Sequence, residues 1–214
     1  MRVISLMILG IIVGALLSLL GEKYNAARFG KEDKITDHKP VRVIVTIALC
    51  LITTGICCYD NLDILTSIKM MILSAALPIL AWTDIQKGIL PNMEILLLAI
   101  IRVAILVAEI IMYPDKGAFV IAGVLLGLLI GGGLFLPIKF ITKNGIGMGD
   151  IKLYAVVGLY LGGISILRVQ VISLFVAMLY GFAMLFIKGD KFDRSIRLGP
   201  FIAVGAMLAL ALGM

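Results

Sequence analysis

The chain consists of long apolar runs that alternate with short polar segments. Most runs are about 15–20 residues long, the length that a helix needs to cross a hydrocarbon core of about 30 Å. Of the 214 residues, 62% are hydrophobic, and the mean hydropathy is +1.15. A soluble domain is typically about 45–50% apolar and could not bury so much apolar surface. The sequence therefore predicts an all-α polytopic transmembrane helical bundle, and continuous rather than alternating runs argue against a β-barrel.

The runs predict about eight membrane spans in a single integral-membrane domain that covers residues 1–214. The polar stretch 22–40, which follows the first run, is expected to be a short cytoplasmic segment. The expected spans are residues 3–20, 41–59, 64–83, 93–113, 118–137, 151–166, 169–187 and 199–212.

Basic residues predict the orientation of this bundle. Segments 22–42, 84–92, 139–152 and 188–198 fall on one side of an eight-span arrangement and hold 14 of the 19 Lys and Arg residues. Lys and Arg concentrate in cytoplasmic loops, so we expect this side in the cytoplasm and both termini outside. The net charge of +6 has the same explanation, and no nucleic-acid partner is expected.

Charged and small residues inside the runs predict how the helices pack. Lys69 and Glu109 fall at similar depth in neighbouring spans, and Arg102 lies on the same helix face as Glu109. Charges inside a span are costly and usually face the bundle, so we expect a Lys69–Glu109 pair with Arg102 facing a polar interior. The alternative is that Lys69 alone reaches the lipid edge. Glycine at every fourth position from Gly123 to Gly131 predicts a close helix contact.

Two acidic residues stand where a polar segment meets an apolar run. Asp84 follows the run 64–83, and Asp150 precedes the run 151–166, so the span count puts both on the cytoplasmic side. Two close carboxyl groups cannot easily both ionise, so such a pair holds one proton. The ionised group can take a proton from water while the protonated one donates to a peptide carbonyl oxygen. This pattern predicts an aspartyl protease site with Asp84 and Asp150 as its catalytic residues.

The residues around Asp150 also fit such a site. Gly147 and Gly149 lack Cβ atoms, so the backbone can take left-handed angles and let an extended substrate approach. Asp150 begins a helix, whose dipole favours the anion and opposes the effect of burial. Lys152 points away from Asp150 on a helix, and we expect it to be an interfacial anchor before an electrostatic partner.

Three motifs occur in order along the chain. They are Asp84 followed by Leu90-Pro91-Asn92, Gly-Met-Gly-Asp-Ile-Lys at 147–152, and Leu-Gly-Pro-Phe-Ile-Ala at 198–203. Together they resemble the signature of the type IV prepilin peptidases, also called leader peptidases, in which the second motif reads G-x-G-D-x-K. The resemblance covers residues 84–203 and implies that Asp84 and Asp150 are the catalytic pair. The residues expected to shape the site or bind substrate are Gly147, Gly149, Lys152, Pro91, Asn92, Gly199 and Pro200.

The resemblance implies a membrane aspartyl endopeptidase of the bacterial cytoplasmic (inner) membrane. Its substrate would be the basic leader of a type IV prepilin or pseudopilin, cut at the cytoplasmic membrane face just before the hydrophobic helix. The expected partners are this substrate and the lipid bilayer. The sequence predicts no particular pilin and no particular oligomeric state.

Many members of the family also methylate the new amino terminus with S-adenosylmethionine. Two departures bear on this second activity: residues 22–40 contain no Cys pair of the kind that binds zinc in many members, and the usual N-terminal motif is reduced to Gly-Ala-Leu-Leu-Ser at 14–18. Proteolysis requires no cofactor, so S-adenosylmethionine is expected only if methyl transfer is retained.

Other classes of function predict different features. An intramembrane protease of the signal-peptide-peptidase or presenilin type also uses G-x-G-D but usually has Tyr before its first Asp, where this chain has Thr83. A proton-coupled transporter would place its carboxylates near the membrane midplane and often carries an internal repeat. A metal site is not expected, because the chain has a single His and no C-x-x-C pair.

Overall fold

The computed structural model describes residues 12, 14–15, 39–59, 62–141, 146–188 and 197–212. Within these residues the regular structure is entirely helical, which confirms the all-α class. The expected first span at 3–20 and the cytoplasmic segment at 22–40 lie largely outside the described residues.

The described helices follow the predicted runs closely. They are α2 (Lys39–Tyr59), α3 (Ile64–Lys87), α4 (Asn92–Met112), the 3-10 turn η2 (Pro114–Lys116), α5 (Gly117–Gly133), α6 (Phe135–Ile141), α7 (Met148–Leu161), α8 (Gly163–Lys188) and α9 (Gly199–Ala211).

Four helical segments are long and apolar enough to cross a membrane. They are Ile64–Lys87, Asn92–Met112, Pro114–Ile141 and Gly163–Ile187, whereas Val43–Tyr59 and Gly199–Ala211 are shorter apolar helices. Four such segments identify an integral membrane protein in the described part of the chain, while the total of about eight spans stays a prediction.

The predicted boundary between the sixth and seventh spans is wrong. The sequence analysis placed the sixth span at 151–166 and the seventh at 169–187, with the turn near Arg168. The structure ends α7 at Leu161 and begins α8 at Gly163, so Arg168 lies inside α8. The break falls at Gly162, whose φ of 87° lies in a region that glycine adopts at little cost.

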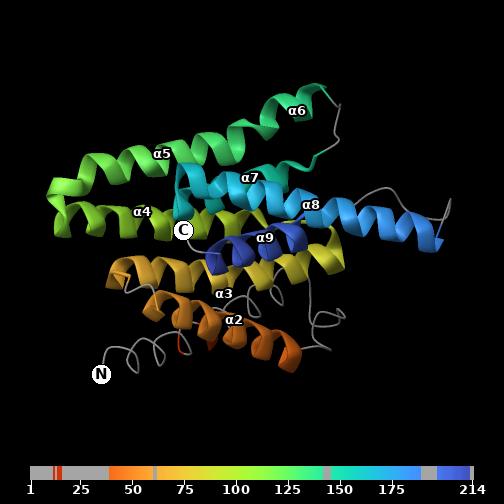
Figure 1. Ribbon diagram of the computed structural model, residues 1–214, viewed down its shortest axis with the longest axis horizontal. Helices are drawn as coiled ribbons and strands as arrows, with labels where there is room; N and C mark the ends of the chain where they lie inside the picture. The colour runs from red at the N-terminus through yellow and green to blue at the C-terminus, as the bar shows by residue number, and fades with distance from the viewer. Residues whose placement is uncertain are drawn as a thin grey trace.

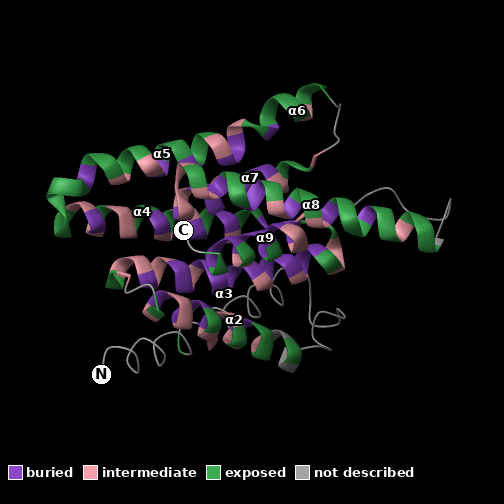
Figure 2. Cartoon of the chain, viewed as in Figure 1, coloured by how far each residue is buried: buried purple, intermediate pink, exposed green. Residues whose placement is uncertain are grey.

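The helices lie side by side, and the helix ends that carry the predicted site residues lie together. In Figure 1 the ends of α3 and α6 and the beginnings of α4, α7 and α9 lie towards the right of the view. Helix α7 is in the interior, between α4, α5 and α8. Figure 2 shows buried residues concentrated on α3 and α7. The far end of α8 is mostly exposed.

The closest helix contact joins α5 and α7, as the glycine spacing predicted. A Cβ atom added to Gly127 would collide with the carbonyl oxygen of Gly158, and one added to Gly131 would collide with that of Tyr154. The two backbones therefore touch at both levels. Gly123, the third member of the predicted face, has no atom within 4 Å of its Cβ position, so a side chain there would point into open space.

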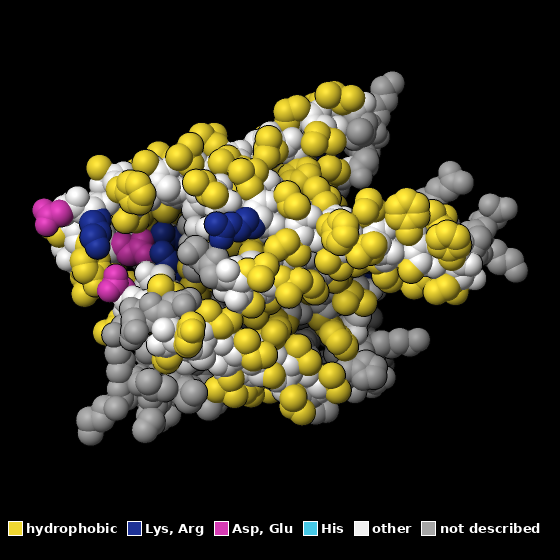
Figure 3. Space-filling model, viewed as in Figure 1, with side chains coloured by type: hydrophobic (Ala, Val, Ile, Leu, Met, Phe, Trp, Pro, Cys, Tyr) yellow, Lys and Arg dark blue, Asp and Glu magenta, His cyan; other side chains and the backbone are white. Residues whose placement is uncertain are grey.

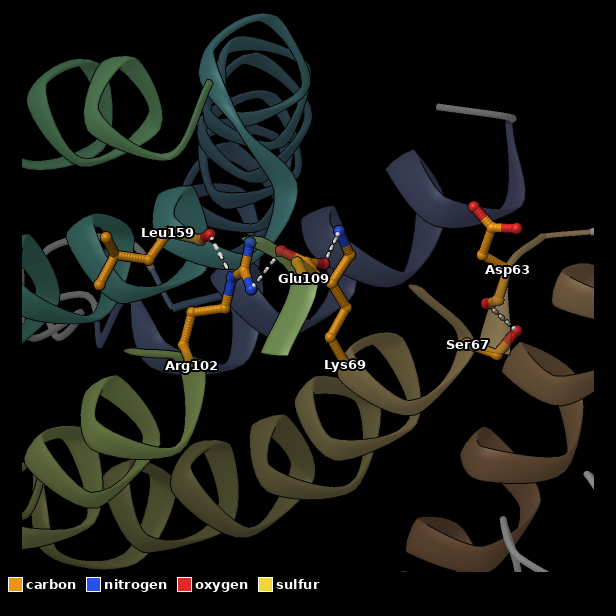
Figure 4. A network of polar contacts seen from close by, with 6 residues as sticks. All are labelled: Asp63, Ser67, Lys69, Arg102, Glu109 and Leu159. Carbon is orange, nitrogen blue, oxygen red and sulfur yellow. Dashed lines mark hydrogen bonds and ion pairs between the residues drawn. The ribbon is translucent and has the colours of Figure 1, made fainter. Parts of the chain in front are cut away.

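A buried charged cluster joins three helices at the end of the bundle opposite the predicted site residues. Glu109 accepts hydrogen bonds from Lys69 Nζ at 3.1 Å and from Arg102 Nη1 at 2.9 Å, which confirms the predicted pair. Arg102 Nε also donates to the carbonyl oxygen of Leu159 at 2.9 Å, so the cluster spans α3, α4 and α7 (Figure 4). Arg102 is only 2% exposed.

The outer surface matches a lipid environment. Hydrophobic side chains cover most of the face drawn in Figure 3, and the visible charged side chains gather towards one end. Large apolar residues stay exposed along α5 and α8, including Phe119 at 84% and Phe186 at 89%. Such a surface is expected where acyl chains replace water.

Candidate active site

Asp84 lies in the last turn of α3. The third span was expected to end at residue 83, with a loop over 84–92, but α3 continues to Lys87. The helix ends at Gly88, which has a left-handed φ of 65° and donates its N–H to the Asp84 carbonyl. The loop is therefore only Gly88–Pro91. Asp84 is 5% exposed, so its carboxyl group is fixed inside the end of the bundle.

The segment before α9 contacts both the side chain and the main chain of Asp84. The backbone N–H of Gly199 donates to Asp84 Oδ2 at 3.0 Å. A Cβ atom on Gly199 would lie 2.6 Å from the same oxygen, which explains why glycine is required there. Arg197 Nη1 donates to the carbonyl oxygens of Asp84, at 3.2 Å, and of Ile85.

Asp150 lies in the first turn of α7, and Gly147 is the N-cap of that helix. Burial and the negative charge of Asp84 raise the pKa of Asp150 to about 7, while a hydrogen bond from the Gly147 backbone opposes the rise. The electrostatic effect of Asp84 on Asp150 means that the structure brings the two carboxyl groups into interaction. A raised pKa of this kind is common among carboxyl groups that hold a proton for catalysis.

The glycines beside Asp150 act through size and not through backbone angle. The expectation of left-handed angles is wrong: Gly147 has φ −64° and ψ 140°, and among the described glycines only Gly88 and Gly162 have positive φ. A Cβ atom on Gly147 would lie 2.8 Å from Asp150 Oδ2, and one on Gly149 would lie 3.0 Å from the Cβ of Leu90. Both glycines thus leave room for close contacts.

Lys152 connects the second motif to the first. Its Nζ donates to Asn92 Oδ1 at 3.0 Å, between α7 and the first residue of α4. Pro91 is buried as the N-cap of α4, and Pro200 occupies the first turn of α9. All the predicted site residues therefore lie on the helix ends that surround Asp84 and Asp150. Lys152 is exposed, as an interfacial residue would be, but it also has a specific partner.

Arg197 is the site residue that the sequence analysis missed. It counted Arg197 only as one of the basic residues that predict a cytoplasmic segment. Its position directly before the third motif, which begins at residue 198, was the available signal. Among the described residues, no group of three or more His, Cys, Asp or Glu side chains could hold a metal ion.

These features define a helical membrane protein with two interacting Asp residues at one end of its bundle. The family model described as the type IV leader peptidase family matches residues 71–187, which contain both Asp84 and Asp150. The chain therefore belongs to this family. No solved structure was found to match the chain.

Two curated relatives have names that include leader peptidase. A prepilin leader peptidase/N-methyltransferase of Aeromonas salmonicida is 28% identical over 148 residues, which cover 69% of this chain and 50% of that protein. A protein of Bacillus subtilis with the same name is 33% identical over 135 residues, which cover 63% of this chain and 52% of that protein. This chain is thus similar to about half the length of each relative.

Proposed function

We propose that this protein is an aspartyl endopeptidase that removes the leader peptides of type IV prepilins or pseudopilins. The observation that carries the proposal is the electrostatic interaction between Asp84 and Asp150 at one end of an apolar helical bundle. Membership of the type IV leader peptidase family supports the same reaction. The transporter alternative has less support, because both carboxyl groups lie at helix ends rather than in mid-helix.

The proposed mechanism uses the single proton that the pair shares. The ionised carboxylate removes a proton from a water molecule, and the water oxygen attacks the carbonyl carbon of the scissile peptide bond. The protonated carboxyl group gives its proton to the carbonyl oxygen, which forms a neutral tetrahedral diol. Collapse of the diol breaks the C–N bond as a proton moves to the leaving nitrogen, and a new acid and a new amine result. The pKa of Asp150, raised to about 7, suits it to hold the proton.

We propose that this end of the bundle faces the cytoplasm, with about eight spans in the bacterial inner membrane and both termini outside. A prepilin leader is basic and precedes an apolar helix, so its scissile bond would lie at the membrane surface. The helix ends that carry Asp84 and Asp150 would lie at the same level. We expect all these parts to form one integral-membrane domain.

Cleavage of a purified prepilin by the detergent-solubilised protein tests the proposal. Mass spectrometry of the products should find one cut, at the junction between the basic leader and the apolar helix. Cuts inside the apolar helix would instead support a protease of the signal-peptide-peptidase type. No cut in any of several prepilins, together with proton flux in proteoliposomes, would support a transporter.

Methyl transfer is a separate question. The relatives are named as N-methyltransferases as well as peptidases, but the stretch that resembles the family's N-terminal motif lies largely outside the described residues. We assign no methyl-donor site among the described residues. We propose that proteolysis needs no cofactor. Addition of S-adenosylmethionine to the cleavage assay, followed by the mass of the product, tests whether a methyl group is added.

A further inference from the structure

Arg197 contacts the end of the helix that carries Asp84. Its Nη1 donates to the carbonyl oxygens of Asp84, at 3.2 Å, and of Ile85. Its Nε would lie 3.2 Å from a Cβ atom on Gly88, the left-handed residue that ends α3. The guanidinium group therefore covers the last turn of the helix.

This contact has a clear physical basis. The last carbonyl groups of a helix lack partners within the helix and carry partial negative charge, so a cation is favourable there. Arginine is suited to the position because its planar group carries several donors in a fixed geometry. Gly88 N–H also donates to the Asp84 carbonyl, at 2.8 Å. The main chain of Asp84 is consequently held from two directions.

The same short segment also holds the Asp84 side chain. Gly199, two residues after Arg197, donates its backbone N–H to Asp84 Oδ2 at 3.0 Å. Residues 197 and 199 thus bind the backbone and the carboxylate of one aspartate, and Asp150 on α7 interacts with that carboxylate electrostatically. A shift of this segment would change the position of Asp84 relative to Asp150.

Arg197 also places a positive charge near the Asp84 carboxyl group, which opposes the effect of burial together with the Gly199 N–H. Two described charged groups interact with that carboxyl group, the cation Arg197 and the anion Asp150 of α7. Further charged residues lie on α3 and on the helices packed against it. Helix α3 itself carries Lys87, α4 has Glu94 in its first turn, and α7 has Lys152, which is bonded to Asn92. Helix α2 contains Lys39 and Arg42, whose side chains are not described. A guanidinium group beside a carboxyl group favours its ionised form.

We propose that Arg197 is a positioning residue of the active site, which fixes the end of α3 and keeps Asp84 as the ionised member of the pair. This inference rests on the proposed peptidase function and assigns a separate role to each of the two Asp residues. Asp84 accepts the proton from water, and Asp150 donates its proton to the carbonyl oxygen. Arg197 itself need not touch the substrate.

The test is the pH dependence of kcat for prepilin cleavage by three variants. Arg197→Gln removes the charge and keeps a polar side chain, whereas Arg197→Lys keeps the charge and loses the planar fork. Lys116→Gln, which removes a cation from the exposed η2 turn at the other end of the bundle, is the matched control. Arg197 is exposed, so its variants are expected to fold, and thermal unfolding of each detergent-purified variant checks this.

For Arg197→Gln we expect the acidic limb of the kcat profile to move to higher pH, because the Asp84 carboxylate loses a nearby positive charge. On the acidic side kcat should therefore fall relative to the wild type, with little change at the plateau. Arg197→Lys should keep the wild-type limb at a lower kcat, and Lys116→Gln should match the wild type.

The inference is overturned if Arg197→Gln keeps the wild-type limb, whether its kcat is unchanged or reduced equally at every pH. That result would leave the peptidase function intact, since the wild type would still cleave. If the wild type cleaves no prepilin, the proposed function itself fails, and the role of Arg197 fails with it.

Discussion

The α5–α7 contact offers a prediction in which two similar substitutions have opposite signs. Ala in place of Gly within a helix is favourable by about 1 kcal/mol when nothing obstructs the new methyl group. Gly123 has no atom within 4 Å of its Cβ position, so Gly123→Ala should stabilise the protein by about this amount.

Gly127→Ala should have the reverse effect, although it lies one turn further along the same helix. Its Cβ would collide with the Gly158 carbonyl oxygen and lie 2.8 Å from the Gly158 carbonyl carbon and 3.0 Å from that of Gly162. These are backbone atoms, which cannot rotate away, so α5 and α7 must separate. Overpacking costs about 1–3 kcal/mol, and its upper end applies here. After the gain in helix propensity, we expect a net loss of about 2 kcal/mol.

Reversible unfolding in mixed micelles, with the fraction of SDS as denaturant and circular dichroism as the signal, measures both variants. The two free energies of unfolding should differ by about 3 kcal/mol. The reasoning is refuted if Gly127→Ala is as stable as Gly123→Ala. Equal destabilisation by both substitutions would also refute it, because only one of the two sites lacks space.

Three further predictions concern charged groups. Glu109→Gln should lower the free energy of unfolding by about 3 kcal/mol, because it leaves the buried Arg102 and the mostly buried Lys69 without their shared anion. A loss of only about 0.6 kcal/mol, the value of an average interhelical hydrogen bond, would contradict this. Cleavage should decline as pH rises through about 7, because Asp150, whose pKa is raised to about 7, then loses its proton. The raised pKa of Asp150 also means that its protonated form contributes stability that is fully present below the ordinary pKa of 3.8 and is lost as pH rises from there to about 7. Asp150→Asn should remove that pH dependence, which unfolding at several pH values would measure.

The sequence predicted the features that depend on the repetition of simple patterns. Apolar runs specify helices because lipid leaves backbone groups no other partners, and a four-residue glycine spacing put Gly127 and Gly131 on one helix face. The Lys69–Glu109 pair followed from the cost of charge inside a span. The position of Asp84 and Asp150 at helix ends on the same side of the bundle followed from the number of spans between them.

Other features depend on atomic fit, which pattern does not encode. The run from 151 to 187 is nearly continuous, so the break at Gly162 was outweighed by the more conspicuous charge of Arg168. Gly147 and Gly149 were correctly placed at the site for the wrong reason, since neither has a left-handed angle. Arg197 looked like one basic loop residue among several, because its contact with Asp84 joins positions 113 residues apart.

The most direct test of the central claim is prepilin cleavage by Asp84→Asn and by Asp150→Asn, each compared with the wild type in the same detergent. Asn keeps the shape of the side chain but cannot ionise or hold the shared proton. If the two Asp residues act as a catalytic pair, the wild type cuts at the leader junction and both folded variants are inactive. If either folded variant keeps full activity, the pair is not the catalytic centre.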